Sequence, residues 1–309
     1  MGFGKGFGKV ILFGEHFVVY DGMPAIVSAI DKSTTAEVNR TSNPGFFITD
    51  NRHATPGYKE NYAKQQKESV ERMVAEMGLD FSKDGVDIKL AGDLFVAGGI
   101  GASAASCAAI ARALSDEYGL SLSDKQINEL ALEGDKAYAG NPSGVDNTAA
   151  VYGGLIWFQK EPPIMELMKT PEPVRIVMGN TGKVANTKVA VAGVRERKEK
   201  DPEKYGVIFE DAKKLVFDAK ESLLSGDQDR TARLINRNHG LLQEIEVSSP
   251  ELDKLCEIAL ENGALAAKMT GGGMGGYMYA LTPDEELQKQ VVSAMEAEGF
   301  TAFATNVGV

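Results

Sequence analysis

The chain has 309 residues, enough for two domains that each bury a substantial core. Hydrophobic residues make up 43% of it and charged residues 25%, a balance that excludes wholesale disorder. The net charge of −11 excludes a basic surface for nucleic acid or an anionic membrane, so a phosphate-bearing ligand must be held locally. Glycine, with 34 residues, exceeds its average share of roughly 7%, which indicates backbone that turns sharply or approaches a ligand.

The cellular setting is indicated by what the sequence lacks. Cys107 and Cys256 lie far apart in apolar helical patterns, which supports neither a disulfide framework nor a cysteine zinc site. Residues 1–16 do not form a secretory signal, because glycine and charged residues break their apolar stretch. The longest uncharged apolar run, 149–158, is about half of the ~20 residues that cross a membrane. We therefore expect a cytoplasmic protein without a membrane partner.

The apolar pattern of the first half predicts strands, helices and one glycine-rich loop. In chain order we expect three strands, a surface helix, a strand, the loop and two helices at 9–13, 25–30, 34–38, 58–77, 85–90, 92–102, 103–118 and 123–138. Residues 1–7 are expected to form a flexible tail. The pair Gly8-Lys9 does not belong to a phosphate-binding loop of the form G-x-x-x-x-G-K-[ST]. That motif would require glycine at position 3 and serine or threonine at position 10, where the chain has Phe3 and Val10.

Four prolines between 162 and 173 mark a domain boundary, and we expect domains at 1–165 and 166–309. Beyond the boundary the pattern predicts a strand, three helices, two strands, a helix and a strand at 174–178, 203–225, 229–246, 250–262, 265–269, 276–281, 284–298 and 300–305. This order predicts a ferredoxin-like α+β domain with extra helices.

The segment AGGIGASAAS at 97–106 lies between a predicted strand and a predicted helix. Glycines there expose backbone N–H groups that can hold a phosphate, and the helix N-terminus adds the positive end of its dipole. Ser103, at the helix start, can turn its hydroxyl to a metal carried with the phosphates. The alternative is close helix packing on small residues, with Ser103 as an N-cap.

The same segment also fits a dinucleotide fingerprint. Gly99, Gly101 and Ala104 match its spacing, and Asp116 or Glu117 lies within the loose range of a ribose-binding acid. This interpretation predicts an NAD(P)-dependent dehydrogenase. It is weakened because alternating parallel strands do not continue on either side.

A second glycine cluster and two acids complete the candidate features. Five glycines fall within 271–276 between two predicted strands, so this is either a floppy connection or a second backbone cradle closing over a ligand from the other domain. Asp135 lies on a helix, and a proline-glycine turn can bring Asp146 near it. Two carboxylates, a serine and a glycine loop suit metal-assisted phosphoryl transfer, although each acid alone is better explained as an exposed helix or turn residue.

Together, four segments resemble the ordered motifs of the GHMP kinases, named for galacto-, homoserine, mevalonate and phosphomevalonate kinases. The segments, which span almost the whole chain, are 8–26, 97–106, 133–147 and 268–277. The resemblance implies an α+β, two-domain GHMP kinase fold with a ribosomal-S5-domain-2-like N-terminal domain and a ferredoxin-like C-terminal domain. The first and third segments, with 181–197 and 236–249, are most similar to the members that act on mevalonate.

The resemblance implies an ATP-dependent, Mg²⁺-requiring enzyme that phosphorylates the C5 hydroxyl of mevalonate to 5-phosphomevalonate in isoprenoid biosynthesis. Phosphomevalonate, homoserine or a sugar is the alternative acceptor within the family. The expected binding partner is then a small-molecule substrate, mevalonate, and not a nucleic acid. A homodimer is compatible with this interpretation.

The resemblance also implies roles for single residues. Asp146 would be the catalytic aspartate with Lys9 beside it, and Ser103 and Asp135 would hold Mg²⁺. The residues around the ATP phosphates would be Ala97, Gly98, Gly99, Ile100, Gly101, Ala102, Ser103, Ala104, Ala105 and Ser106, supported by Gly271, Gly272 and Gly273. Those that contact mevalonate would be Glu15, His16 and Thr187.

Two departures from the family pattern matter. Asp135 stands where a glutamate is usual, so its shorter side chain would reach the metal through water or a shifted helix. Ala185 stands where an arginine is often seen, so the role of that arginine is absent or passes to Lys183 or Arg195. His239 is expected to be structural, since it lies mid-helix among apolar neighbours.

Overall fold

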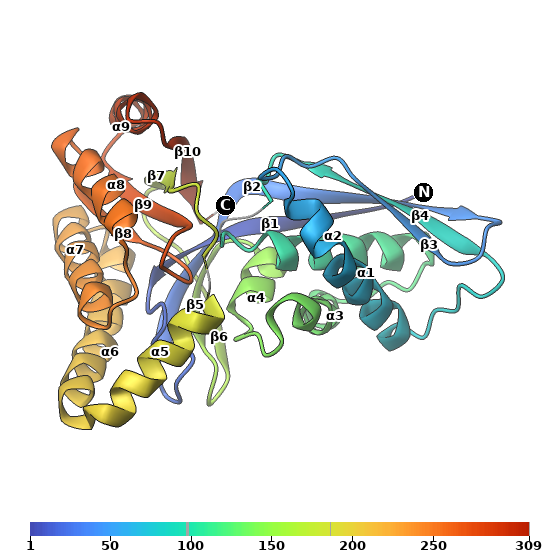
Figure 1. The fold of residues 1–309 in the computed structure, drawn as a ribbon, viewed down its shortest axis with the longest axis horizontal. Helices are drawn as coiled ribbons and strands as arrows, with labels where there is room; N and C mark the ends of the chain where they lie inside the picture. Colours follow the sequence, from blue (N-terminus) through green and yellow to red (C-terminus); the bar gives the residue numbers. More distant parts are fainter. Residues whose placement is uncertain (97–98, 186, 309) are drawn as a thin grey trace. The chain divides into compact units, whose positions relative to one another are not determined.

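The computed structural model describes residues 1–96, 99–185 and 187–308. They form two compact units, each assembled from several segments of the chain (Figure 1). Unit 1 comprises Met1–Lys9, Ala29–Ala97 and Gly101–Gly153, and unit 2 comprises Val10–Ser28, Gly98–Ile100 and Gly154–Val309. The first two strands, β1 (Gly2–Phe13) and β2 (Pro24–Thr41), each contribute residues to both units.

Unit 1 consists of strands with helices on one side of them (Figure 1). Besides parts of β1 and β2 it contains β3 (Phe46–Asp50), β4 (Gly85–Gly92), α1 (Tyr58–Glu76), α2 (Ala102–Glu117), α3 (Asp124–Ala139) and α4 (Val145–Tyr152). Strand β4, which precedes the glycine loop, pairs antiparallel with β2 and parallel with β3. A dinucleotide fingerprint belongs to a mostly parallel sheet, so this pairing does not support the dehydrogenase interpretation.

The glycines of β1 allow helix α2 to lie directly against the strand. A Cβ added to Gly2, Gly4 or Gly6 would lie 2.1–2.2 Å from a backbone carbonyl oxygen of α2. These oxygens belong, in the same order, to Ala113, Ala109 and Ala105. Two strand residues advance about 6.8 Å and four helix residues about 6 Å, so the two repeats stay nearly in step. The prediction of a flexible tail over 1–7 is therefore wrong. Residues 2–7 belong to β1, and their glycines allow α2 to pack closely against this strand.

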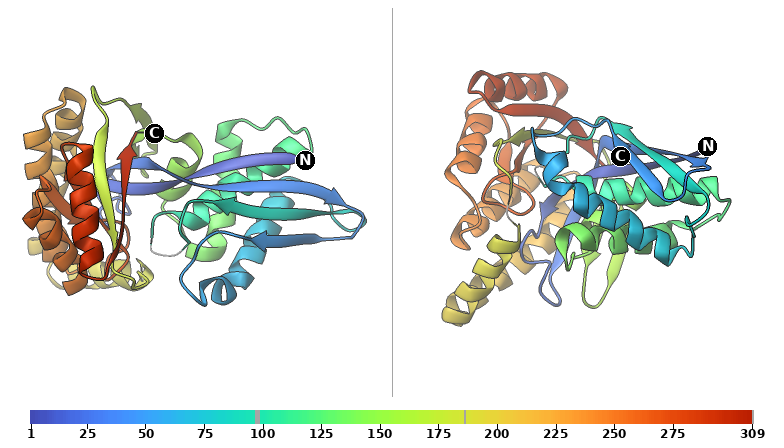
Figure 2. Two further views of the ribbon diagram at one scale, coloured as in Figure 1. Left: turned by 90° about the horizontal axis from the view of Figure 1, so that it is seen from above. Right: turned by 45° about the vertical axis from the view of Figure 1, so that its right-hand side comes forward.

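Unit 2 contains an antiparallel sheet with helices on one face of it (Figure 2). The strands of this sheet are β7 (Val174–Asn180), β8 (Ala266–Met269), β9 (Tyr277–Thr282) and β10 (Thr301–Val307). The unit also contains β5 (Leu155–Gln159) and β6 (Ile164–Met168), which pair with each other, and β5 pairs further with β2. Its helices are α5 (Thr187–Lys200), α6 (Pro202–Ser225), α7 (Gln228–Glu244), α8 (Pro250–Glu261) and α9 (Glu285–Ala297). The order β10-β7-β9-β8 is that of a ferredoxin-like sheet, which confirms the predicted fold class.

The predicted helices are all present, and each end lies within two residues of its predicted position. The strands predicted at 25–30 and 34–38 are one continuous strand, β2, because the polar residues between them stay extended. Five elements were not predicted. Four of them, β3, α4, β5 and β6, are too short to show a period, and α5 buries only Ala190 and Val194.

Replacing Gly4 by alanine should lower the free energy of unfolding by about 1–3 kcal/mol. The new Cβ would lie 2.1 Å from the carbonyl oxygen of Ala109, so α2 must move away from β1. The matched control is Gly206→Ala in α6, where a Cβ meets nothing within 4 Å, and it should gain about 0.5–1 kcal/mol. Urea unfolding measures both variants, and equal stabilities would contradict the close packing.

Candidate functional site

Four polar side chains of unit 1 come together from four separate elements. We name them the Lys9 cluster: Lys9 at the end of β1's part in unit 1, Ser103 in the first turn of α2, Asp135 on α3 and Asp146 in the first turn of α4. The Nζ atom of Lys9 lies 3.0 Å from Oδ1 of Asp146. Asp135 accepts a hydrogen bond from Ser103 and lies within the fields of Lys9 and Asp146. The structure thus brings together the four residues expected to act in catalysis and metal binding.

Glycines set the starts of the two helices that contribute to the cluster. Gly101 before α2 and Gly144 before α4 have φ angles of 74° and 90°, the left-handed region that favours glycine. A Cβ on Gly101 would also lie 2.8 Å from Cγ of Lys9. Asp146 follows Gly144 closely, so its carboxylate lies at the positive end of the α4 dipole. Both helix N-termini are therefore fixed beside charged groups.

Asp135 is the electrostatically unusual member of the cluster. Its side chain is only 4% exposed. Burial and the charge of Asp146 raise the pKa of Asp135 from 3.8 to about 6, against the opposing effects of Ser103 and Lys9. Among the described residues, its Oδ1 atom has no hydrogen-bond partner. A buried carboxylate oxygen left in this state fits a divalent cation, which would supply the missing charge.

The glycine loop before α2 is described only in part, since Ala97 and Gly98 lie outside the described residues. Gly99 has a φ of 89°, and Ile100 is buried beside it. The first turn of α2 offers N–H groups that have no acceptor within the helix. Ala104 and Ala105 are buried, and the Ser106 hydroxyl donates to the carbonyl of Ala102 over 2.8 Å. Ser106 is therefore turned into the protein.

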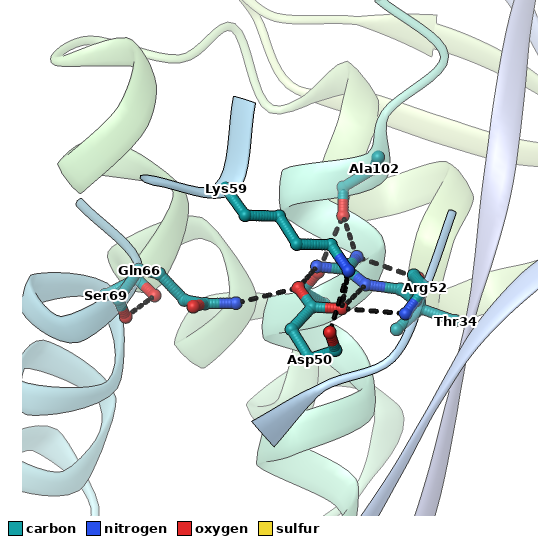
Figure 3. A network of polar contacts seen from close by, with 8 residues as sticks. Thr34, Asp50, Arg52, Lys59, Gln66, Ser69 and Ala102 are labelled. Carbon is teal, nitrogen blue, oxygen red and sulfur yellow. Dashed lines mark hydrogen bonds and ion pairs between the residues drawn. The ribbon is translucent and has the colours of Figure 1, made fainter. Parts of the chain in front are cut away.

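Sequence reasoning missed Arg52, a buried arginine beneath the first turn of α2 (Figure 3). Its guanidinium binds the Asp50 carboxylate and also donates to Ala102 and Ser106. Its partners in α2 are about 50 residues away in the chain. No spacing rule marks an arginine of this kind in a sequence.

In unit 2, one of the expected substrate residues, Glu15, belongs to a buried ion pair that the sequence did not predict. The Glu15 carboxylate pairs with the ammonium of Lys268, and both side chains are fully buried. Burial lowers the pKa of Lys268, and the charge of Glu15 opposes this effect. Glu15 is thus placed inside the unit. The signal that could have found Lys268 is a lysine within an otherwise apolar strand, β8.

His16 lies next to this pair in a left-handed conformation with a φ of 60°. Its Nε2 atom is 3.1 Å from the carbonyl oxygen of Gly272. Burial lowers the pKa of His16 to about 4, so the ring is neutral at pH 7. A carbonyl oxygen only accepts hydrogen bonds, so Nε2 carries the proton. The buried Nδ1 atom is then an acceptor, and within the described part of the chain it has no partner.

The second glycine cluster is tightly packed. A Cβ on Gly272 would lie 2.1 Å from Oγ1 of Thr187, and a Cβ on Gly273 would lie 2.1 Å from the carbonyl oxygen of Val247. Gly271 and Gly273 also have φ angles of 76° and 69°. The interpretation as a floppy connection is therefore wrong. The loop brings Thr187, the exposed first residue of α5, next to Gly272.

The remaining candidates lie in settled environments or on the surface. Lys183 forms an ion pair with Glu251, whereas Arg195 is exposed on α5. His239 Nε2 lies 3.1 Å from Asp253, and its Nδ1 accepts from the Met269 N–H over 3.4 Å. These contacts agree with a structural role for His239.

Family models, relatives of known sequence and solved structures all indicate the same protein family. Residues 61–154 match the GHMP kinases N terminal domain, and residues 219–301 match the GHMP kinases C terminal model. A mevalonate kinase of Pyrococcus horikoshii is 37% identical over 97% of this chain and 93% of its own length. The crystal structure of Leishmania major mevalonate kinase in complex with R-mevalonate has a TM-score of 0.94 at 35% identity, covering 100% of this chain and 96% of that one. The Methanococcus jannaschii mevalonate kinase structure, at 23% identity and a TM-score of 0.82, shares the fold.

Asp135→Asn should stabilise the ligand-free protein at pH 7 by about 3 kcal/mol. The folded chain keeps the Asp135 proton up to a pKa of about 6, whereas the unfolded chain releases it near 3.8. Folded-state stability is therefore lost as the pH rises through this window, and asparagine has no proton to lose. Urea unfolding near pH 4 should show little difference between the two proteins. A variant less stable than the wild type at pH 7 would contradict this assignment.

Proposed function

The chain belongs to the GHMP kinase family, and from this premise we propose that it transfers the γ-phosphate of ATP to the C5 hydroxyl of mevalonate. The product is 5-phosphomevalonate, a precursor of isoprenoids. The observation that carries the proposal is the Lys9–Asp146 ion pair beside the buried Asp135 carboxylate. The choice of mevalonate is supported by relatives named mevalonate kinase and by a similar structure bound to R-mevalonate.

Asp146 acts on the hydroxyl that attacks the phosphate. Its side chain is 34% exposed, whereas its partner Lys9 is 4% exposed. The ammonium thus holds one carboxylate oxygen from inside, and the carboxylate stays accessible to a hydroxyl whose proton it orients or accepts. Lys9 also supplies positive charge for the oxygens of the transferred group.

Asp135 and Ser103 would hold Mg²⁺. The fit rests on the unpartnered, buried Oδ1 of Asp135 and on the adjacent serine hydroxyl. The described residues contain no group of three acidic, histidine or cysteine side chains that could hold a metal ion. Few protein ligands are typical of Mg²⁺, which keeps water and takes phosphate oxygens from its nucleotide. When bound, the ion neutralises charge on the phosphates.

The ATP phosphates bind at the loop and first turn over 99–106, with Ala97 and Gly98 included in this assignment. The N–H groups and dipole of α2 supply local positive potential in a chain of net charge −11. The tightly packed loop over 271–273 is assigned the supporting role. The family domains are assigned to 1–165, with the ATP loop and Asp146, and to 166–309.

Mevalonate binds at His16 and Thr187. The Nδ1 atom of His16 is a neutral, buried acceptor, which suits a hydroxyl group of the substrate. Glu15, paired with Lys268, supports the turn at His16 from inside the unit. Arg195, exposed on α5, is the cation assigned to the substrate carboxylate, because Lys183 is engaged with Glu251.

We place the enzyme in the cytoplasm, where its two buried, free cysteines stay reduced. None of the helices in the described residues is long and apolar enough to cross a membrane. A homodimer is proposed as the state to be tested by light scattering.

A coupled assay of ADP release tests the acceptor. Turnover should be seen with mevalonate, and should be absent or far slower with phosphomevalonate, homoserine and galactose. MgATP should also raise the melting temperature, whereas NADPH should leave it unchanged. No turnover of mevalonate at about 1 mM, the upper end of the usual range of KM, would exclude the proposed substrate.

Asp146→Asn should lower kcat by about 10²–10⁴-fold and leave the affinity for MgADP nearly unchanged, because the carboxylate acts on the hydroxyl. The matched control is Asp124→Asn, which removes another first-turn aspartate, 60% exposed, from the same unit. Its kcat should equal that of the wild type. Steady-state kinetics and titration calorimetry give both quantities, and near-normal turnover of Asp146→Asn would refute its catalytic role.

A further inference from the structure

The strongest feature outside the residues assigned so far is the buried network around Arg52 in unit 1 (Figure 3). Arg52 follows β3 and is only 4% exposed, although arginine is rarely buried unless it is paired. Its Nε atom donates to Oδ1 of Asp50 over 3.0 Å, and its Nη2 atom donates to Oδ2 over 2.6 Å. The guanidinium therefore forms a two-pronged ion pair, the strongest geometry open to it.

Asp50 is in turn anchored from α1. Gln66 donates to Oδ2 of Asp50 over 3.0 Å, and Lys59 donates to its backbone carbonyl over 2.7 Å. Burial raises the pKa of the Asp50 carboxyl, but the hydrogen bonds and charge of Arg52 outweigh this effect and hold the pKa below its usual value. The ion pair is thus ionised and fixed to both β3 and α1.

The opposite side of the guanidinium reaches the first turn of α2. Nη1 of Arg52 donates to the Ala102 carbonyl over 3.3 Å and to the Ser106 hydroxyl over 2.5 Å, and also contacts Thr34 of β2. Ser103, assigned to the metal, lies in the same turn between Ala102 and Ser106. Arg52, Ser103 and Ser106 also line one small cavity of about 20 Å³.

We propose that Arg52 is a positioning residue for phosphoryl transfer, which acts by holding the phosphate-binding turn of α2 in place through Ala102 and Ser106. This inference rests on the proposed function. A buried ion pair contributes little net stability compared with apolar packing, but a fully bonded one specifies a single arrangement of the groups around it. Phosphoryl transfer needs such an arrangement, because a misplacement of about 1 Å costs about 100-fold in rate.

The first test compares Arg52→Lys with Arg72→Lys. Lysine keeps the charge of Arg52 but cannot form the fork and reach α2 at once. We expect kcat and the affinity for MgADP each to fall by about 10-fold or more, with an unchanged KM for mevalonate. Arg72 on α1 is also paired with carboxylates, those of Glu68 and Glu133, but is 39% exposed, so its variant should behave as the wild type.

A second variant tests the connection to α2 without removing a buried charge. Ser106→Ala deletes one acceptor of Arg52, and should lower kcat in the same direction but less. The double variant should be no slower than Arg52→Lys alone, since both changes break one connection. Fully multiplicative effects, or a lowered melting temperature with wild-type kcat in the folded protein, would overturn the proposal.

Ser106→Ala carries the test if Arg52→Lys does not fold, and wild-type kcat together with wild-type MgADP affinity in it would then refute the proposal. The readouts also separate this inference from the proposed function. If the wild type did not phosphorylate mevalonate, the proposed function would fail. MgADP affinity would still decide whether Arg52 positions the nucleotide-binding turn.

Discussion

The close approach of β1 and α2 is the constraint on which the site in unit 1 depends. One face of the strand carries glycines where side chains would be, so the carbonyls of α2 lie where Cβ atoms would stand. Lys9 follows these glycines in the same strand. Gly101, just before α2, lies so close to Lys9 that a Cβ on Gly101 would meet the Lys9 side chain. The packing therefore sets where the ammonium and the helix N-terminus lie. Their register is a property of the backbone and not of flexible side chains.

Within unit 1, the buried carboxylate of Asp135 lowers the stability of the ligand-free protein. Asp135 is buried beside a second carboxylate, and its raised pKa reports that the ionised form is disfavoured in the ligand-free protein. The Lys9–Asp146 pair offsets part of the repulsion. A cation delivered with the nucleotide would turn the strained arrangement into a satisfied one. Sites that trade stability for function in this way are common among enzymes.

The sequence predicted elements with a long period and residues within recognisable motifs. All seven helices that it predicted are present, because their amphipathic patterns extend over several turns. The turn between Asp135 and Asp146 already suggested from the sequence that these two acids lie close together, although each by itself has a simpler explanation. The individual roles of these residues, and the place of Lys9 beside Asp146, came only from the resemblance to a family. The local pattern wrongly predicted a flexible tail over 1–7, because the glycines there pack against helix α2, which lies about 100 residues away in the chain. Arg52 and Lys268 were missed for the same reason, because Lys268 meets Glu15 across 253 residues.

The central claim concerns which bond is formed, and the identity of the product tests it most directly. The enzyme would be incubated with MgATP and mevalonate, and the product analysed by ³¹P and ¹H NMR. The account predicts one new phosphate monoester whose phosphorus couples to the C5 methylene protons, formed together with ADP. A phosphate on another oxygen, or release of inorganic phosphate with mevalonate unchanged, would contradict it.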